Sequence, residues 1–500
     1  MFGTFMEVLD TTVVNVSLPH IAGNLSATVD EATWVLTSYL VANAIILPLT
    51  GWLANFFGRK NLLMMSLIGF TTASLFCGLA PTLPMLIVFR LVQGACGGCM
   101  QPLSQAVLLE AFPPEDRGKA MGFWGLGIVS APVLGPVLGG WLTDSYSWRW
   151  VFYINLPVGI ASIIMTRAFI FDPPYIRRLT NRIDYWGIGM LAVWVGTLQV
   201  ALDKGQEDDW LSSTFITTLL IVSGLCVIGF IWRELAARDP VVSLKIFRVR
   251  TYAVGVFLMT MLGFALYGSL VVLPIWLQTL LGYPAVQAGL ALAPRGMGSM
   301  LGMPIVGSIA SRFDNRKLLA IGLALCGYTM WSFSRMNLNV GYWDLFWPQF
   351  LQGIALSLIF VPLTTVTMAP VPRENMGNAT SLFNLMRNLG GSMGIASATA
   401  LTLRFQQEHQ NYLVRHTSPL NPRFNGMIAG LQSMFESRGA GPLLASRRAL
   451  ATVYGLVQQQ TAMLTFIDVF HIFMWVFFGM IPLLFLLKKP AKGGPAPPAH

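Results

Sequence analysis

Pro113-Pro114-Glu115-Asp116-Arg117-Gly118-Lys119-Ala120 is matched, 259 residues later, by Pro372-Arg373-Glu374-Asn375-Met376-Gly377-Asn378-Ala379. Three shorter matches keep the same order: Leu18-Pro19 with Leu273-Pro274, Pro48-x-x-Gly51 with Pro304-x-x-Gly307, and Gln93-Gly94 with Gln352-Gly353. The offsets of the four matches drift only from 255 to 259 residues. The sequence therefore predicts a duplicated unit, with one copy in each half of the chain.

The composition places both copies in a membrane. Only 11% of the residues are charged and 54% are hydrophobic, whereas a soluble domain carries roughly 25% charged residues. The net charge of +10 is spread over the loops between apolar runs, which argues against a nucleic-acid-binding patch. The five cysteines all lie inside apolar runs, so we expect no disulfide bond. Helices in a bilayer are the predicted building blocks.

Fourteen apolar runs each approach the ~20 residues that a helix needs to cross a bilayer. They cover residues 2–22, 34–55, 62–81, 84–106, 119–142, 150–171, 184–202, 213–232, 252–277, 287–310, 317–335, 343–366, 379–403 and 463–487. The repeat relates spans 1–6 to spans 9–14, and spans 7 and 8 have no counterpart. We therefore predict an all-α membrane protein of two pseudo-symmetric six-helix bundles plus two inserted helices, as in secondary transporters.

The chain divides into four predicted parts. Residues 1–175 form the first bundle, and residues 176–250 hold the two inserted helices and their linkers. Residues 251–487 form the second bundle, including a long outer segment at 404–462, and residues 488–500 are expected to be disordered. Most Lys and Arg of the short loops fall on one side when both termini are cytoplasmic, as the positive-inside rule requires.

The loop after span 2 has the features of a conformational element. Gly51-Trp52-Leu53-Ala54-Asn55-Phe56-Phe57-Gly58-Arg59-Lys60 precedes span 3, and Gly307–Lys317, with Arg312, repeats it in the second half. Glycines permit a tight turn and close helix approach, and the cations suit the inner headgroup level. The alternative is a loop that only anchors the topology.

Span 5 has small residues every three or four positions: Gly122, Ala131, Gly135, Gly139 and Gly140. Such a face lets a neighbouring helix pack backbone to backbone. Pro136 removes an internal hydrogen bond and permits a bend. The segment serves packing alone, or packing plus a hinge, and we favour the second reading. The pattern resembles the antiporter motif of drug exporters, which implies that the hinge limits proton leak.

Asp10 lies about 12 Å into the first span at the helical rise per residue. A charged carboxylate at that depth costs a few kcal/mol. Burial favours the protonated form and a nearby cation favours the charged form, so Asp10 is a candidate proton carrier. Glu7 is expected on the same face, nearer water. The alternatives are a fixed structural ion pair for Asp10 and a solvated helix end for Glu7.

Arg90 is the expected partner of Asp10, because both lie at depths that a long side chain can bridge. Arg90, Gln93, Gly97 and Gln101 follow helical spacing and predict one polar stripe along span 4. Arginine stays protonated, so it would modulate the carboxylate rather than carry the proton. A purely structural role is the alternative. The second half has Gln349 at the matching position.

These stretches, with Leu9–Pro19 in span 1 and Trp148–Gly159 at span 6, resemble the major facilitator superfamily and, within it, the fourteen-helix drug/proton antiporter family of the EmrB/QacA type. Asn55 stands where the family usually has aspartate, and Ala131 where glycine is usual. Arg90 and Gln93-Gly94 resemble a helix-4 motif whose arginine is associated with proton transfer. The resemblance implies the major facilitator fold, an inner-membrane location and proton-coupled export of hydrophobic or cationic toxic compounds.

We expect an apolar, adaptable substrate cavity between the two halves. Aromatic side chains would line it, because aromatic faces attract organic cations. Most aromatic residues of a membrane protein simply face lipid, so each candidate has that alternative. The candidates for the substrate cavity are Asn15, Tyr39, Gln93, Gln101, Phe264, Tyr267, Gln278, Asn384 and Arg387.

The segment 404–462 is too long for a simple connector, and we expect outer amphipathic helices there. It resembles the EmrB branch, which works with a periplasmic adaptor and an outer-membrane channel. A cap over the cavity or a disordered insertion are the alternatives.

No cofactor or metal is expected, since the chain has no phosphate-binding Gly-x4-Gly-Lys-Ser/Thr and no His/Cys cluster. It is not expected to be an enzyme. Export of a natural lipid, peptide or siderophore, or a sensor without flux, are the other functions considered.

Overall fold

The computed structural model describes residues 1–113, 116–172, 184–237, 240–310, 312–418 and 420–487. The predicted disordered tail at 488–500 lies outside these residues. The described part is helical, with α1 (Phe2–Asn24), α2 (Val29–Phe57), α3 (Arg59–Leu79), α4 (Leu83–Gly97), α5 (Met100–Ala111), α6 (Arg117–Ser145), α7 (Trp150–Tyr153), α8 (Asn155–Phe169), α9 (Tyr185–Lys204), α10 (Thr214–Ala236), α11 (Arg250–Thr279), α12 (Ala285–Ile309), α13 (Asn315–Ser334), α14 (Tyr342–Met368), α15 (Met376–Val414), α16 (Pro422–Ser437) and α17 (Pro442–Met480).

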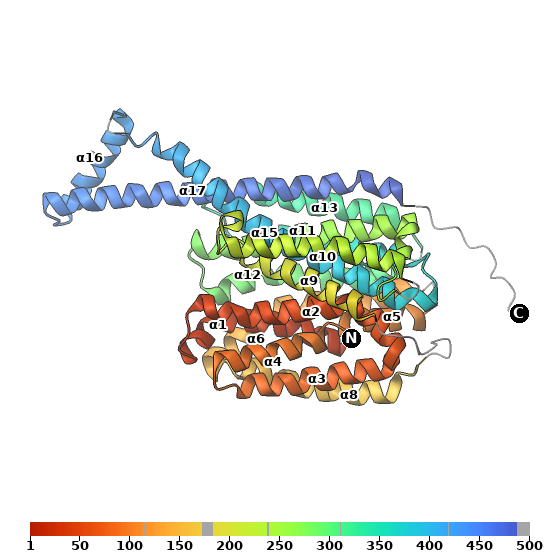
Figure 1. The fold of residues 1–500 in the computed structure, drawn as a ribbon. Coiled ribbons are helices and arrows are strands. Elements are labelled where there is room, and N and C mark those ends of the chain that lie inside the picture. The colour runs from red at the N-terminus through yellow and green to blue at the C-terminus, as the bar shows by residue number, and fades with distance from the viewer. Residues whose placement is uncertain (114–115, 173–183, 238–239, 311, 419, 488–500) are drawn as a thin grey trace, which may run out of the picture.

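The helices form two bundles that lie one above the other in Figure 1, so the predicted all-α architecture is confirmed. Helices α1–α8 make the first bundle, and α11–α15 with α17 make the second. Each predicted span coincides with one helix or with two short helices in line. Span 84–106 is split into α4 and α5, and span 150–171 into α7 and α8. Pro102 and Pro157 cause the breaks, because neither can donate to the carbonyl four residues earlier.

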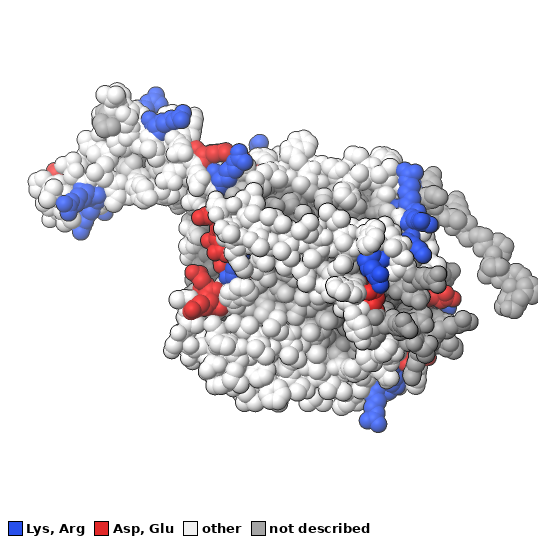
Figure 2. Space-filling model, in the orientation of Figure 1, with Lys and Arg blue, Asp and Glu red and all other residues white. Residues whose placement is uncertain are grey.

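A wide band without Lys, Arg, Asp or Glu separates the two charged ends of the molecule on the face that Figure 2 shows. Nine helical segments of the described residues are long and apolar enough to cross a membrane, or ten if the bent α6 counts as one span. The chain is a multi-pass membrane protein. We call the end where α2 meets α3 at Gly58 the basic end, and the opposite end the hairpin end.

The inserted helices α9 and α10 lie outside the two bundles, where α10 packs on α9 and α9 bridges the bundles. Gln199 on α9 donates a hydrogen bond of 2.9 Å to Ser392 on α15. Asp203, also on α9, accepts a hydrogen bond from Thr37 on α2. One inserted helix therefore contacts both halves, along the seam between them.

The segment 404–462 continues two membrane helices instead of forming a separate domain. Helices α15 and α17 have 39 residues each, or roughly 58 Å at 1.5 Å per residue, far more than the ~30 Å apolar layer of a bilayer. With α16 they make a hairpin that projects from the body (Figure 1). The expectation of outer helices in this segment agrees with the structure.

Helix α6 uses its small residues against two partners. A Cβ on Gly135 would lie 2.1 Å from the hydroxyl of Thr12, and one on Gly139 would lie 2.9 Å from the carbonyl oxygen of Val13. Gly118, nearer the basic end, faces Gly307 on α12, where a Cβ would lie 2.9 Å from the carbonyl oxygen. The helix bends by 40° next to Pro132, whose carbonyl loses its intrahelical donor at Pro136. Helix α6 thus joins α1 to the second bundle.

Candidate functional site

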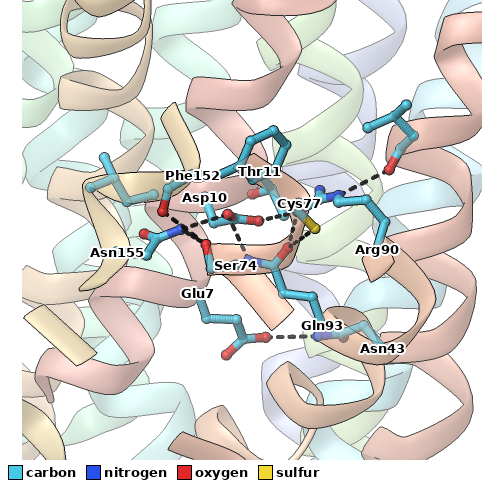
Figure 3. A network of polar contacts seen from close by, with 12 residues as sticks. Glu7, Asp10, Thr11, Asn43, Ser74, Cys77, Arg90, Gln93, Phe152 and Asn155 are labelled. Atoms are coloured by element: carbon cyan, nitrogen blue, oxygen red, sulfur yellow. Dashed lines mark hydrogen bonds and ion pairs between the residues drawn. The ribbon is translucent and has the colours of Figure 1, made fainter. Parts of the chain in front are cut away.

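The structure brings Asp10 and Arg90 together in the interior of the first bundle (Figure 3). The Nη1 atom of Arg90 lies 2.5 Å from Oδ2 of Asp10, and both side chains are 0% exposed. The other carboxylate oxygen, Oδ1, accepts from Nε2 of Gln93 at 3.0 Å and from Nδ2 of Asn155 at 2.7 Å. Helices α1, α4 and α8 therefore share one carboxylate.

The ion pair is held by further polar contacts. The Nε atom of Arg90 donates to the carbonyl oxygen of Val35 at 3.1 Å, and the ring of Tyr39 lies 4.2 Å from the guanidinium carbon. Ser74 accepts from Asn155 at 3.1 Å and donates to a backbone carbonyl. A charge as deeply buried as this one is tolerated only with several such partners.

Asp10 can accept a proton in this network, and its protonation would change the contacts of Arg90. Asp10 faces the bundle interior, where its partners belong to α4 and α8 of the same bundle. Within the described residues, Nη2 of Arg90 and Oδ1 of Asn155 have no hydrogen-bond partner. A proton on Asp10 would remove the counter-charge of Arg90, which stays cationic. The unpaired Oδ1 of Asn155 is an acceptor with which the guanidinium could then form a new contact.

Glu7 lies one turn closer to the basic end and is buried, so the alternative of a solvated helix end is wrong. Only 4% of it is exposed, because α2 and α5 cover it. Its Oε1 accepts from Nδ2 of Asn43 at 2.9 Å, and Gln101 lies beside it. Glu7 is thus the carboxylate that faces the second bundle.

The bundles meet next to Glu7 through side chains of α5 and α15. Arg387 donates to Oε1 of Gln101, and Nδ2 of Asn384 lies 2.6 Å from Oε1 of Gln105. The hydroxyl of Thr380 donates to the carbonyl oxygen of Pro102 at 3.2 Å. The short helix α5 therefore carries the polar contacts that close the basic half of the seam.

The other cavity candidates separate into different environments. Tyr39 and Gln93 belong to the Asp10 network. Phe264 and Tyr267 pack on the glycine face of α15, where a Cβ on Gly391 would lie 2.7 Å from the ring of Tyr267. Asn15 and Gln278 are exposed. The predicted stripe along span 4 is interrupted at Gly98, so Gln101 leaves the face of Arg90 and Gln93 and joins the seam.

The loop after α2 is built around Gly58, whose φ of +86° favours glycine. Arg59 forms a buried ion pair with Glu110 at the end of α5. The backbone N–H of Lys60 donates to Oδ1 of Asp172 at 2.8 Å. Asn55, which stands where the family usually has aspartate, is half-buried in α2 and carries no charge. The cation–carboxylate contact of this loop is the one between Arg59 and Glu110.

The remaining motif residues are two buried glycines and one arginine at the surface. A Cβ on Gly51 would lie 2.7 Å from the backbone nitrogen of Asn378 on α15, so this glycine permits contact between the bundles. Gly140 is buried in α6, and Arg312 is exposed at the basic end.

Sequence reasoning missed Asn43, Gln105 and Glu110 as site residues, and left Asn155 in a motif without a role. Asn43 follows Tyr39 by one helical turn, and Gln105 follows Gln101 by one turn, so helical spacing was the available signal. Glu110 is an acid at the end of an apolar run, which predicts a cation nearby.

The chain is similar to known membrane transporters. The family model described as Major Facilitator Superfamily matches residues 1–395. The multidrug export protein EmrB of Escherichia coli is 36% identical over 99% of this chain and 96% of its own length. EmrB of Haemophilus influenzae is 41% identical over 84% and 82%. The fatty acid resistance protein FarB of Neisseria gonorrhoeae is 37% identical over 98% and 95%. The solved human organic anion transporter MFSD10 has the same fold, with a TM-score of 0.62 at 13% identity over 97% of both chains.

Proposed function

Because the chain belongs to the Major Facilitator Superfamily, we propose that it exports hydrophobic or cationic toxic compounds by proton-coupled alternating access. The relatives named as multidrug export proteins support the cargo class. The observation that carries proton coupling is the fully buried Asp10–Arg90 pair, since a carboxylate in this position can exchange its counter-ion for a proton.

The coupling route runs from α1 and α4 to the seam. Protonation of Asp10 frees the guanidinium of Arg90, and α4 then shifts relative to α1. Helix α5 follows α4 across the break at Gly98 and carries Gln101 and Gln105, the residues that contact α15. A proton inside the first bundle can thus loosen contacts with the second bundle, which is what alternating access requires.

Glu7 is the second proposed proton site. It lies between Asn43 and Gln101, and Arg387 of the second bundle is close enough to interact with it electrostatically. A proton on Glu7 would weaken that attraction across the seam. The two carboxylates, one turn apart on α1, therefore contact different helices: Asp10 contacts α4 and α8, and Glu7 contacts α2 and α5.

The membrane orientation follows from the charges. The basic end faces the cytoplasm in our proposal, which places both chain ends on that side of a bacterial inner membrane and the hairpin outside. The hairpin α15–α17 is then available to a periplasmic adaptor protein and an outer-membrane channel. A groove of about 300 Å³ between its helices is lined by apolar side chains that include Leu413, Phe424, Val453 and Leu456.

Export of an amphipathic natural compound is a second candidate, because a relative of similar identity is named for fatty acid resistance. Vesicles that accumulate a labelled fatty acid but no cationic dye would favour it. A protein that moves neither compound would be a sensor.

The test uses inverted membrane vesicles with an imposed pH gradient and a fluorescent cationic dye. Asp10→Asn keeps the shape of the side chain but cannot ionise, so gradient-driven dye movement should fall at least tenfold. Glu7→Gln should show a smaller loss. Asp344→Asn is the matched control, because Asp344 lies at the exposed start of α14. Wild-type coupling in Asp10→Asn would exclude Asp10 from the mechanism.

A further inference from the structure

The internal repeat places a region of the second bundle in the position that the Asp10 site has in the first. The offset of 256 residues relates Tyr39 to Arg295, and the offset of 259 relates Gly94 to Gly353. A Cβ on Gly94 would lie 2.3 Å from the carbonyl oxygen of Tyr39, and one on Gly353 would lie 2.0 Å from that of Arg295. Helices α12 and α14 therefore cross as α2 and α4 do.

The two equivalent regions differ in their charges. The offset of 255 residues relates Asp10 on α1 to Ala265 on α11, and Arg90 corresponds to Gln349. In this equivalent region the cation of the second bundle is Arg295, and a fully buried alanine stands where the first bundle has its carboxylate. Arg295 therefore has no carboxylate at the position equivalent to Asp10.

Arg295 is buried without an acidic partner. It is 5% exposed, and its Nε donates to Oε1 of Gln349 at 2.9 Å. Among the described residues, the thiol of Cys326 is the titratable group that interacts with it, and no carboxylate does. A desolvated cation without a counter-ion is strongly unfavourable. The described side chains supply no carboxylate to compensate this charge.

Polar atoms that lack a partner among the described residues, three donors and one acceptor, lie on Arg295 and on two residues of α14. Within the described part of the chain, Nη1 of Arg295, Nε2 of Gln349 and both polar atoms of Gln352 have no hydrogen-bond partner. Gln349 and Gln352 are three residues apart on α14, so they share a helix face, and both are fully buried. One charged and two neutral groups thus retain unsatisfied N–H donors in one enclosed region.

We propose that Arg295, Gln349 and Gln352 form a binding site for a monovalent anionic group, either a free halide ion or the carboxylate of a transported compound. Charge-assisted N–H donors without competing acids suit such a ligand. The enclosure of the site favours a small group. The site lies in the bundle opposite to the proposed proton site and does not depend on Asp10.

The test measures the thermal unfolding midpoint of the full chain in lipid nanodiscs in sulfate buffer, with chloride or benzoate added at constant ionic strength. The midpoint should rise by several degrees and saturate. A rise with chloride identifies a halide site, and a rise with benzoate alone identifies a carboxylate site. No rise with either anion would overturn the proposal.

Arg295→Gln should abolish the rise, whereas Arg335→Gln, a matched change beside Trp331 at the surface, should keep it. If Arg295→Gln does not fold, Gln352→Leu should raise the half-saturating anion concentration at least tenfold. Ala265→Asp supplies an internal acid and should remove the response. An unchanged anion response in these three variants would also contradict the site.

Discussion

Asn384 of the second bundle donates a hydrogen bond of 2.6 Å to Gln105 of the first, at a depth where both side chains are fully buried. The bond joins α5, which continues the helix of Arg90, to α15, which continues into the outer hairpin. It therefore connects the proposed proton site to the element that moves against it. In the proposed transport cycle, this bond would favour contact between the two bundles at the basic end.

Asn384→Ala should open the basic end more often. Losing one buried hydrogen bond costs about 1 kcal/mol, so the closed population should fall roughly fivefold relative to the open one. Electron–electron distance measurements between spin labels at positions 119 and 312 report the change. Asn337→Ala, in the exposed α13–α14 loop, should leave the distance distribution unaltered. Identical distributions for Asn384→Ala and wild type would show that this bond does not hold the seam.

Asp10→Asn should destabilise the protein even when transport is not measured. Removing one member of a buried ion pair leaves Arg90 uncompensated, which costs about 3–5 kcal/mol. The double variant Asp10→Asn/Arg90→Gln should recover much of this loss, since both charges are then absent. Unfolding in nanodiscs measures the free energies of the single and double variants. Additive losses would mean that the two residues are not energetically coupled.

The fold could be predicted because it depends on length, apolarity and repetition, which are properties of the sequence alone. Asp10 and Arg90 could be paired because few side chains carry charge within the spans. Glu7 could not be placed, since its burial depends on α2 and α5, which are distant in sequence. Gln101 left the predicted stripe because Pro102 breaks span 4, an effect that helical spacing ignores.

Asp184 should stabilise the start of α9 in a pH-dependent way. Desolvation raises its pKa, but hydrogen bonds from Gly187 and Arg233 outweigh this, and the pKa lies below its ordinary value of 3.8. A lowered pKa means that folding favours the charged form. The stabilisation is complete above about pH 4 and disappears as the pH falls toward the folded-state pKa. Hydrogen-exchange protection factors at the first turn of α9, which correct for the intrinsic pH dependence of exchange, should fall in that window, whereas Asp184→Ala should give low protection factors at every pH.

The projecting part of α17 should bind another protein. Leu443, Leu450 and Tyr454 follow one face of this helix and are 72%, 52% and 60% exposed, although the segment lies beyond the apolar layer. Exposed apolar side chains in water mark interaction surfaces. Leu450→Glu with Tyr454→Glu should therefore abolish drug resistance of intact cells that carry the proposed partners, yet leave dye transport in inverted vesicles unchanged. Gln459→Glu, on another face of α17, should affect neither. Equal losses in cells and vesicles would mean that the hairpin serves transport itself, and full resistance in the double variant would exclude docking at this face.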